Sequence, residues 1–472
     1  MKNYLLALGL LCSLYSFSQE DNIHQISTLY EAPTDPLVKE KLKTWENQKF
    51  GMLIHWGVYA VPGIIESWQL CSEPWLERPE GMSYNDYKKW YWNLSSVFNP
   101  VNFDPDSWAT AAESAGMKYV VFTTKHHDGF NMFDTQQTDY KITNGPFQNH
   151  PKANVAKHVF DAFRKKDFMI GAYFSKPDWH SQDFWWDKYA TPDRNPNYDI
   201  RKYPERWERF QDFTFNQIKE LMTGYGQIDI LWLDGGWVRP RETVTDEVRA
   251  WGAPIPDWDQ QVNMPKIADM ARKAQPGIIF ADRTVHGPYE NYQTPEHSIP
   301  ETKLNNPWES CITLGDAWGY VPNDSYKSAN QVIALLTEIV AKGGNLLLGV
   351  GPQSDGLIPL DAVKRLEEIG NWLDKNGDAI YGTHAIDTYT DGHTFFTANV
   401  DQFFAIMPLE AASTIPNKIT WEMNLPKKGS NVTLLETGEK LDWKLKDGKA
   451  VITLPKSIQN LRTPALAFSF KS

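Results

Sequence analysis

One apolar segment in the middle of the chain limits most strongly how it can fold. Residues 228–237 read Ile-Asp-Ile-Leu-Trp-Leu-Asp-Gly-Gly-Trp. Apolar side chains at successive positions fill both faces of a strand, which is typical of a parallel sheet covered by helices. The strand ends in Asp234, where a carboxylate does no packing. Because active sites of parallel barrels lie at the carboxyl ends of their strands, Asp234 is the first candidate for a catalytic group.

The order of the other elements predicts a barrel. Strand-like runs occur at residues 50–57, 118–127, 168–175, 228–236, 277–283 and 345–351. Helix-like segments alternate with them at residues 106–115, 159–166, 206–222, 264–274, 328–341 and 362–375. This alternation indicates an α/β fold. We expect a (β/α)8-like barrel of the TIM type, with one or two strands that are irregular or hidden.

Three long connections lack a helical period. They cover residues 64–97, 176–204 and 238–261 and are rich in Trp, Tyr and Pro. Connections of this length are uncommon unless they carry function. Each follows a strand, so all three are expected on one face of the barrel, where they would wall a pocket.

The pattern changes after about Asp378. Short alternating runs at 394–399, 403–407, 432–435 and 450–454 are separated by turns such as Lys446-Asp447-Gly448. This is typical of an antiparallel β-sandwich. We therefore expect a catalytic barrel at residues 19–378 and a sandwich at 379–472. A packing role for the sandwich is favoured over sugar binding.

The first residues resemble a targeting segment. Lys2 precedes an apolar run from Tyr4 to Leu14, and Ser16 and Ser18 supply small residues before a cleavage point. This predicts a signal peptide at residues 1–18 and an exported protein, periplasmic or secreted. The run is too short to span a bilayer, so no membrane insertion is expected after cleavage. Cys71 and Cys311 then remain, either bridged or as two buried thiols.

Composition narrows the class of ligand. The chain has 20 Trp, 20 Tyr and 23 Phe residues. Aromatic planes suit the apolar C–H faces of sugar rings, which favours a carbohydrate site. The net charge of −12 argues against nucleic acid as a partner. Nothing in the sequence fixes the oligomeric state.

Polar side chains collect where the predicted strands end. They are His55, the pair His126-His127, Tyr173, Asp234 and Arg283. In a barrel these strand ends converge, and imidazoles with a guanidinium suit a ligand rich in hydroxyl groups. Hydrolysis of a glycoside needs a second carboxylate. Residue chemistry leaves three candidates open, which are Glu296, Glu301 and Glu309.

The ordered set of motifs resembles the α-L-fucosidases of glycoside hydrolase family 29. The motifs are His55-Trp56-Gly57, His126-His127-Asp128-Gly129-Phe130, Leu231-Trp232-Leu233-Asp234-Gly235, Thr294-Pro295-Glu296, Trp308-Glu309-Ser310-Cys311, Trp318-Gly319-Tyr320 and the run 342–348. The resemblance implies a barrel followed by a β-sandwich. It also implies exo-acting hydrolysis of terminal α-L-fucose from an oligosaccharide or glycoconjugate, with retention of configuration and without metal or other cofactor. One departure is Gly349, where many members carry Asn.

The resemblance also implies roles for single residues. Asp234 matches the nucleophile and Glu296 the acid/base, with Glu309 the second choice and Glu301 the third. Residues implied to bind the sugar are His55, Glu66, Trp68, His126, His127, Tyr173, Trp232, Arg283 and Trp318, with Trp232 and Trp318 facing the C5 methyl group. Retention requires the two catalytic carboxyl groups to lie roughly 5–5.5 Å apart.

Three other functions compete with this one. An α-L-galactosidase or another exo-glycosidase uses the same scaffold, and a sugar-binding protein retains the pocket without catalysis. A metal-dependent hydrolase would use His55, His126, His127 and Asp234 as ligands. The adjacent histidines argue against it, because successive side chains of a strand point to opposite sides.

Overall fold

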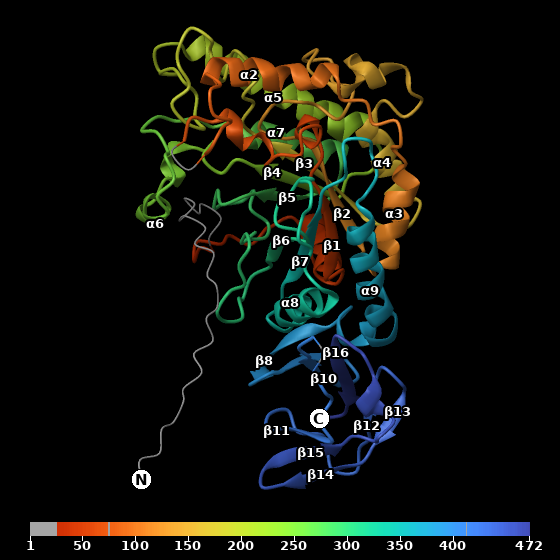
Figure 1. Ribbon diagram of the computed structural model, residues 1–472. Coiled ribbons are helices and arrows are strands. Elements are labelled where there is room, and N and C mark those ends of the chain that lie inside the picture. Colours follow the sequence, from red (N-terminus) through yellow and green to blue (C-terminus); the bar gives the residue numbers. More distant parts are fainter. Residues whose placement is uncertain (1–25, 74–75, 412) are drawn as a thin grey trace, which may run out of the picture.

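A curled sheet of seven parallel strands forms the centre of the molecule (Figure 1). Its strands are β1 (Phe50–Ile54), β2 (Tyr119–Lys125), β3 (Met169–Ser175), β4 (Ile230–Asp234), β5 (Ile279–Asp282), β6 (Glu309–Thr313) and β7 (Asn345–Val350). Their order across the sheet is β5-β4-β3-β2-β1-β7-β6. The predicted parallel α/β fold is confirmed. Strand β6 was the one that the sequence pattern did not predict.

The structure is a computed structural model that describes residues 26–73, 76–411 and 413–472. The expected signal peptide, residues 1–18, lies outside the described residues. Within the described ranges, no helix has both the length and the apolar character needed to cross a bilayer.

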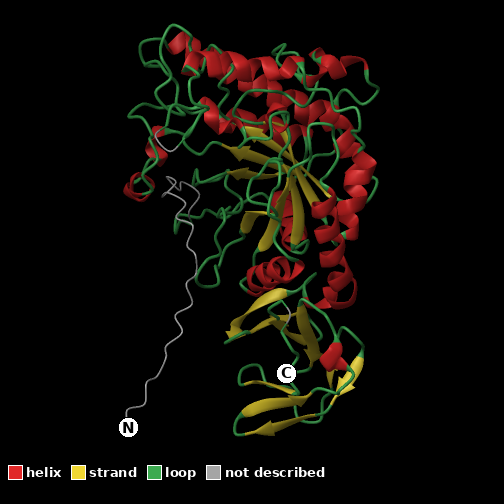
Figure 2. Cartoon of the chain, in the orientation of Figure 1, coloured by secondary structure: helices red, strands yellow, loops and turns green. Residues whose placement is uncertain are grey.

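Most of the helices lie along the outer side of the sheet (Figure 2). The helices of the described residues are α1 (Pro36–Glu46), α2 (Tyr84–Asn93), α3 (Pro105–Ser114), α4 (Val155–Arg164), α5 (Pro204–Gly224), α6 (Asp246–Ala250), α7 (Met264–Ala274), α8 (Ala329–Ala341) and α9 (Leu360–Asn376). The buried side chains of α1 pack inside the curl of the sheet, and α6 lies apart from the sheet. The expectation that connections 64–97 and 238–261 contain no helix was wrong, because α2 and α6 lie in them. Ser83 caps α2 by accepting from the backbone N–H of Asp86, a signal that the sequence carried.

Alternate residues of the strands enter two separate apolar clusters. Leu53, Val121, Ile230 and Ala281 share the cluster inside the sheet's curl. Their neighbours in sequence, such as Leu231, pack with the helices in the larger outer cluster. Because side chains alternate along a strand, residues two positions beyond the inner ones also point inward. His55, Tyr173, Asp234 and Arg283 have this inward parity.

An irregular segment joins the two edges of the sheet, β5 and β6. Glu290 bridges to Ala281 of β5, while Gln293 and Glu296 bridge in parallel to Trp308 and Cys311 beside or in β6. Residues 290–297 thus take the place of an eighth strand. Proline lacks the N–H that a regular ladder needs, and Pro295 lies within this segment. The expected irregular barrel is therefore present, and its irregular element carries Glu296.

Two antiparallel sheets form the C-terminal region below α8 in Figure 1. Their strands are β8 (His384–Asp391), β9 (Thr394–Ala398), β10 (Phe403–Pro408), β11 (Lys418–Trp421), β12 (Val432–Leu434), β13 (Glu439–Leu441), β14 (Trp443–Lys446), β15 (Lys449–Thr453) and β16 (Ala465–Phe470). One apolar cluster, which includes Trp421 and Phe468, lies between the sheets. The Asp447-Gly448 turn joins β14 and β15, and both residues have positive φ, as a tight hairpin requires.

Gly370 of α9 provides a test of how the helices pack. A Cβ added there would lie 1.7 Å from the carbonyl oxygen of Ser114 in α3. We expect Gly370→Ala to lower the free energy of unfolding by about 1–3 kcal/mol, because backbone in a packed interface cannot move freely. Chemical denaturation measures this change. The control is Gly224→Ala at the exposed end of α5, where an added Cβ meets nothing within 4 Å, and an equal loss there would contradict the packing argument.

Candidate active site

Asp234, at the end of β4, is contacted by predicted residues from three other strands. The hydroxyl of Tyr173 donates to its Oδ2 at 2.6 Å, and Nη1 of Arg283 donates to its Oδ1 at 2.9 Å. Nε2 of His127 lies 3.8 Å from Oδ2. These contacts come from the ends of β2, β3 and β5, so four adjacent strands converge on one carboxylate. Asp234 keeps 7% of its surface exposed and so can be reached from the mouth of the barrel.

Glu296 is held beside Asp234 by the same arginine. Nη2 of Arg283 donates to Oε2 of Glu296 at 2.8 Å, while Nη1 binds Asp234. The indole Nε1 of Trp318 donates to Oε1 of Glu296 at 3.1 Å. Because both Nη atoms belong to one guanidinium, the carboxylates of Asp234 and Glu296 lie next to the same group at the mouth of the barrel. Asp234 and Glu296 therefore form a close pair.

The charge states in this group follow from burial and from neighbouring charges. Burial lowers the pKa of His55 to about 4 and the pKa of His126 well below its ordinary value, so both imidazoles are neutral. Burial also disfavours the charge on Arg283, but Asp234 is the largest of the opposing influences, and the net effect raises the pKa of Arg283. The site combines a permanent cation, two carboxylates and neutral imidazoles.

Glu66, Ser67 and Trp68 form one wall of the group. The backbone N–H of Gly319 donates to Oε1 of Glu66, and burial raises the pKa of Glu66 to about 7. The hydroxyl of Ser67 is hydrogen-bonded to Nδ1 of His126. The ring of Trp68 lies 5.1 Å from that of His127. The structure thus brings together the residues of this motif and the β2 histidines.

The two predicted tryptophans occupy different places. Trp318 is half-buried, and its ring lies 5.4 Å from the ring of His55 beside Glu296. Trp232 is buried in the barrel, with its ring 5.1 Å from Tyr173 and 4.4 Å from the guanidinium of Arg283. That Trp232 also faces the ligand stays a prediction, since its exposed fraction is similar to those of Tyr173 and His127. It supports from below the two side chains that bind Asp234.

The alternative acids lie elsewhere. Glu309 is fully buried at the start of β6, the end opposite to the mouth, and accepts from Tyr119 at 2.6 Å and from Trp232 at 3.1 Å. Burial raises its pKa to about 7. Glu301 is exposed on the connection before β6. Of the three candidates, Glu296 is the one that shares a partner with Asp234.

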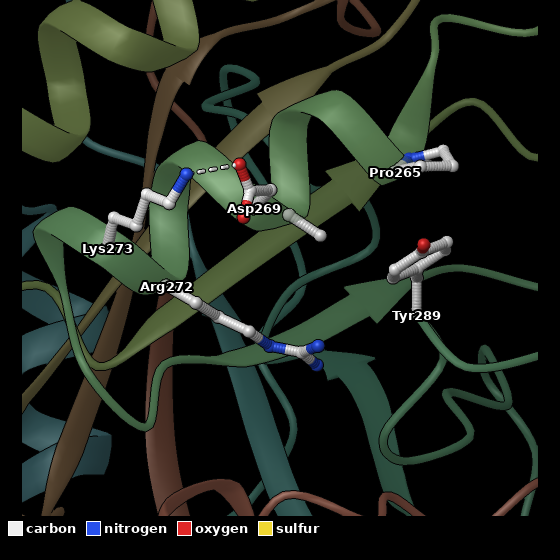
Figure 3. A pocket seen from close by; sticks show the side chains of 6 residues that line it. Pro265, Asp269, Arg272, Lys273 and Tyr289 are labelled. Carbon is white, nitrogen blue, oxygen red and sulfur yellow. Dashed lines mark hydrogen bonds and ion pairs between the residues drawn. The ribbon is translucent and has the colours of Figure 1, made fainter.

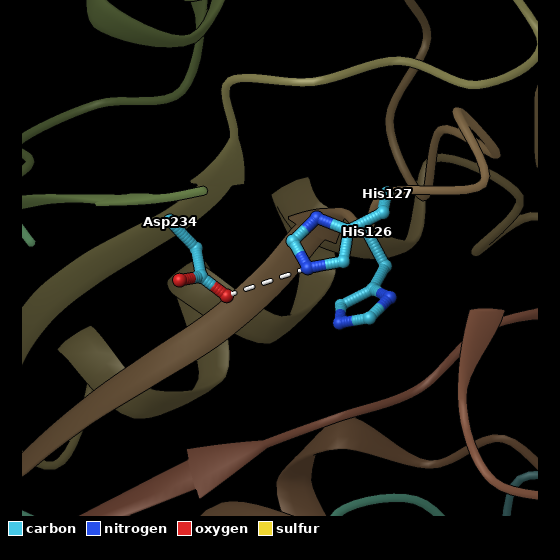
Figure 4. A group of neighbouring side chains, drawn as sticks. All are labelled: His126, His127 and Asp234. Carbon is cyan, nitrogen blue, oxygen red and sulfur yellow. Dashed lines mark ion pairs between the residues drawn. The ribbon is translucent and has the colours of Figure 1, made fainter. Parts of the chain in front are cut away.

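The adjacent histidines point to the same place, contrary to the argument from strand alternation (Figure 4). Ligand atoms of His126, His127 and Asp234 lie within 4.8 Å of one another. Strand β2 ends at Lys125 after a register shift, so His126 and His127 follow it in a turn where alternation no longer applies. That argument against a metal was wrong. A stronger one is the guanidinium of Arg283, whose permanent charge is bound to the same carboxylate and opposes a second cation.

A hollow of about 370 Å³ lies apart from this group, beside α7 (Figure 3). Its lining residues are Pro265, Ala268, Asp269, Arg272, Lys273 and Tyr289. Asp269 is their one carboxylate, and Lys273 pairs with it at 2.7 Å. Without a second carboxylate, this hollow lacks the chemistry of the group around Asp234.

Sequence reasoning missed several supporting residues. Thr294 accepts from Nε of Arg283 at 3.2 Å, and Lys176 forms a buried ion pair with Asp282, the residue before Arg283. Thr294 belongs to the motif Thr294-Pro295-Glu296, which was selected because of its glutamate. Its position two residues before Glu296 was the only feature of the sequence that could have indicated a role for it. Cys71 and Cys311 are both buried free thiols, which settles the open question of a bridge between them.

A parallel barrel with two carboxylates, neutral imidazoles and aromatic side chains at its mouth is typical of one class of protein, the barrel-type glycoside hydrolases. The comparisons with known proteins narrow this class.

The sequence model of the α-L-fucosidase family matches residues 17–378. The plasma α-L-fucosidase of Rattus norvegicus is 27% identical over 471 residues, which cover 95% of each chain. Among solved structures, isoenzyme 1 from Paenibacillus thiaminolyticus has a TM-score of 0.74 and 31% identity, covering 92% of this chain and 99% of its own. The Thermotoga maritima α-fucosidase, solved in complex with fucose, has a TM-score of 0.70 and 27% identity, covering 92% and 98%. The chain belongs to the α-L-fucosidase family and is a glycoside hydrolase.

The neutral, buried state of His55 predicts how stability depends on pH. Its pKa is about 4 in the folded protein, whereas an unfolded chain has a histidine pKa of about 6.5. Between these values the unfolded state binds a proton that the folded state does not. The free energy of unfolding should therefore fall as the pH is lowered from about 6.5 to about 4, by roughly 1–3 kcal/mol for this residue.

Denaturation curves across this pH range compare wild type with His55→Gln. The variant should show a shallower fall in the free energy of unfolding, because it lacks the titrating group. His384→Gln, at an exposed position of β8, is the control and should keep the wild-type slope. An unchanged slope in His55→Gln would show that His55 is not the group responsible.

Proposed function

We propose that the protein is a retaining exo-α-L-fucosidase in which Asp234 is the nucleophile and Glu296 is the acid/base. The observation that carries this assignment is the bridge made by Arg283, which holds both carboxylates at the mouth of the barrel. Retaining glycosidases need closely spaced carboxyl groups, because one must bond directly to the anomeric carbon, and a guanidinium shared by both carboxylates is compatible with that spacing. Because Asp234 itself attacks the sugar in this mechanism, the site needs no space for a water molecule between Asp234 and the anomeric carbon.

In the first step, Asp234 attacks the anomeric carbon while the bond to the leaving oxygen breaks. Glu296 gives its proton to that oxygen, so the aglycone leaves as a neutral alcohol. Tyr173 and Arg283 already donate to Asp234, and these hydrogen bonds keep it ionised and oriented for attack.

In the second step, Glu296 as a carboxylate takes a proton from water. The water oxygen bonds to the anomeric carbon, and the bond to Asp234 breaks. L-Fucose is released with its original anomeric configuration after two inversions. Arg283 and the indole N–H of Trp318 stabilise the anionic form of Glu296 that this step requires.

The remaining predicted residues surround this pair and suit a deoxysugar. Neutral His55 and His126 can donate to and accept from hydroxyl groups, as can His127, and the carboxylate of Glu66 can accept from them. Trp68 and Trp318 are only partly buried, so each has ring surface open to a ligand. A methyl group placed against such a ring gains from burial, which favours fucose over a hydroxylated sugar. The two alternative functions, an α-L-galactosidase and a sugar-binding protein without catalysis, are not favoured.

Neither metal nor another cofactor has a part in this mechanism, since both proton transfer and nucleophilic attack are assigned to side chains. We further propose that residues 1–18 direct export, in agreement with the plasma enzymes among the relatives. The proposed boundary near residue 378 falls just before β8, the first strand of the antiparallel sheets.

The first test is hydrolysis of 4-nitrophenyl α-L-fucoside by wild type and by Asp234→Ala. Wild type should release 4-nitrophenol equally well with and without a chelator, and fucose should appear first as its α anomer in proton spectra. The variant should fold and show no turnover. Added azide should then yield the β-configured fucosyl azide, because a single displacement inverts the centre.

The control for this test is Asp269→Ala in the hollow beside α7, which should keep full activity. A wild type without turnover on this fucoside, or an Asp234→Ala variant that keeps it, would refute the proposal. If the chelator abolishes turnover, the alternative function of a metal-dependent hydrolase would be favoured again.

The second test concerns the acid/base and compares two leaving groups. With methyl α-L-fucoside, whose oxygen needs a proton to leave, Glu296→Ala should lower kcat/KM about 10²–10⁴-fold. With the 4-nitrophenyl fucoside the loss should be much smaller, because 4-nitrophenolate leaves without a proton. Azide should give the α-configured fucosyl azide through the glycosyl-enzyme intermediate.

Glu309→Gln is the matched comparison. It should lower the free energy of unfolding by about 1–3 kcal/mol, because Tyr119 or Trp232 loses its acceptor. Any loss of activity should be equal for the two leaving groups, with no azide product. The opposite result, with azide rescue in Glu309→Gln and none in Glu296→Ala, would exchange their roles.

A further inference from the structure

Glycines at the end of β7 leave space for the segment Trp318–Tyr320. A Cβ added to Gly349 would lie 2.7 Å from Cε3 and 2.8 Å from Cζ3 of the Trp318 ring. A Cβ added to Gly351 would lie 2.4 Å from the backbone carbon of Gly319. No side chain fits at either position while the segment stays where it is.

The segment that fills this space contacts two glutamates of the site, Glu66 and Glu296. The indole Nε1 of Trp318 donates to Glu296 at 3.1 Å, and the backbone N–H of Gly319 donates to Glu66. Gly319 itself admits no side chain, because an added Cβ would lie 2.9 Å from the ring of Tyr59. The segment is therefore enclosed between β7 and Tyr59, and its position fixes where the two donors point.

We propose that Gly349 is a positioning residue for the acid/base, because it seats the Trp318 ring so that its N–H reaches Glu296. This inference rests on the proposed role of Glu296. Gly349 touches no substrate and acts only through Trp318.

The seating of the ring has a measurable chemical effect. An N–H donated to a carboxylate stabilises its ionised form and lowers its pKa. If the ring is displaced, Glu296 should hold its proton to higher pH, and its carboxyl group should be less well oriented. The basic limb of the pH profile of kcat/KM should move upward, and the rate should fall for leaving groups that need a proton.

Gly349→Ala tests this directly. The φ angle of Gly349 lies outside the left-handed region, so alanine is tolerated by the backbone and only the contact with Trp318 changes. We expect kcat/KM for methyl α-L-fucoside to fall about 3- to 10-fold, the effect of losing one hydrogen bond. The 4-nitrophenyl fucoside should be affected less. Gly224→Ala, in open space, should match wild type in both assays.

A double-mutant cycle with Trp318→Ala separates this role from a general effect on β7. When the ring is absent, Gly349→Ala should cause no further loss and no further shift of the pH profile. If Gly349→Ala alone does not fold, recovery of folding in the Trp318→Ala background also assigns the effect to the ring. Equal losses in both backgrounds, or failure to fold in both, would overturn the proposal.

The result can be distinguished from a failure of the proposed function. If Glu296→Ala itself shows no dependence on the leaving group, the acid/base assignment fails and the inference fails with it. If Glu296→Ala shows that dependence and Gly349→Ala leaves rates and pH profile unchanged, only the role of Gly349 is refuted.

Discussion

The buried charge of Arg283 is the constraint on which the site depends. A guanidinium with 2% of its surface exposed is costly unless anions surround it, and here Asp234 and Glu296 supply them. The same contacts fix the positions of the two carboxylates relative to one guanidinium. Thr294 and the ring of Trp232 hold the guanidinium in place from the other sides. The buried charge of Arg283 requires neighbouring anions, and a double displacement requires two neighbouring carboxyl groups. The same pair of side chains meets both requirements.

The irregular closure of the barrel serves the same purpose. A regular eighth strand between β5 and β6 would place side chains by strict alternation, whereas residues 290–297 form only isolated bridges. His297, directly after Glu296, has a positive φ of 49°, which is uncommon for a residue with a side chain. The chain gives up ladder hydrogen bonds here, and Glu296 takes a direction at the mouth that strict alternation does not set. The segment Trp318–Tyr320, seated against the end of β7, then restrains that carboxylate.

Much of the candidate site was predictable from sequence because it lies on regular strands. His55, Tyr173, Asp234 and Arg283 follow or end runs whose alternation fixes their inward direction. Reasoning by alternation failed where the strands stop, since His126 and His127 lie in a turn and point to one place. Alternation also predicted the inward direction of Trp232, but its contacts with Tyr173 and Arg283 depend on neighbours from other strands. The acid/base remained a choice among three glutamates, because all three lie near an element with no period.

The sequence by itself determined the parallel barrel, the C-terminal sheets, the strand-end chemistry and the family, because periodicity and motif order are local properties of the chain. The tertiary structure alone decided which glutamate shares Arg283 with Asp234, since residues 234, 283 and 296 meet only when the sheet curls and its edges are joined. It likewise decided the place of Glu309, at the far end of the barrel, and the close approach of the Trp318 ring to Gly349 of β7. Such outcomes depend on volume and charge shared between distant segments, which no local pattern encodes.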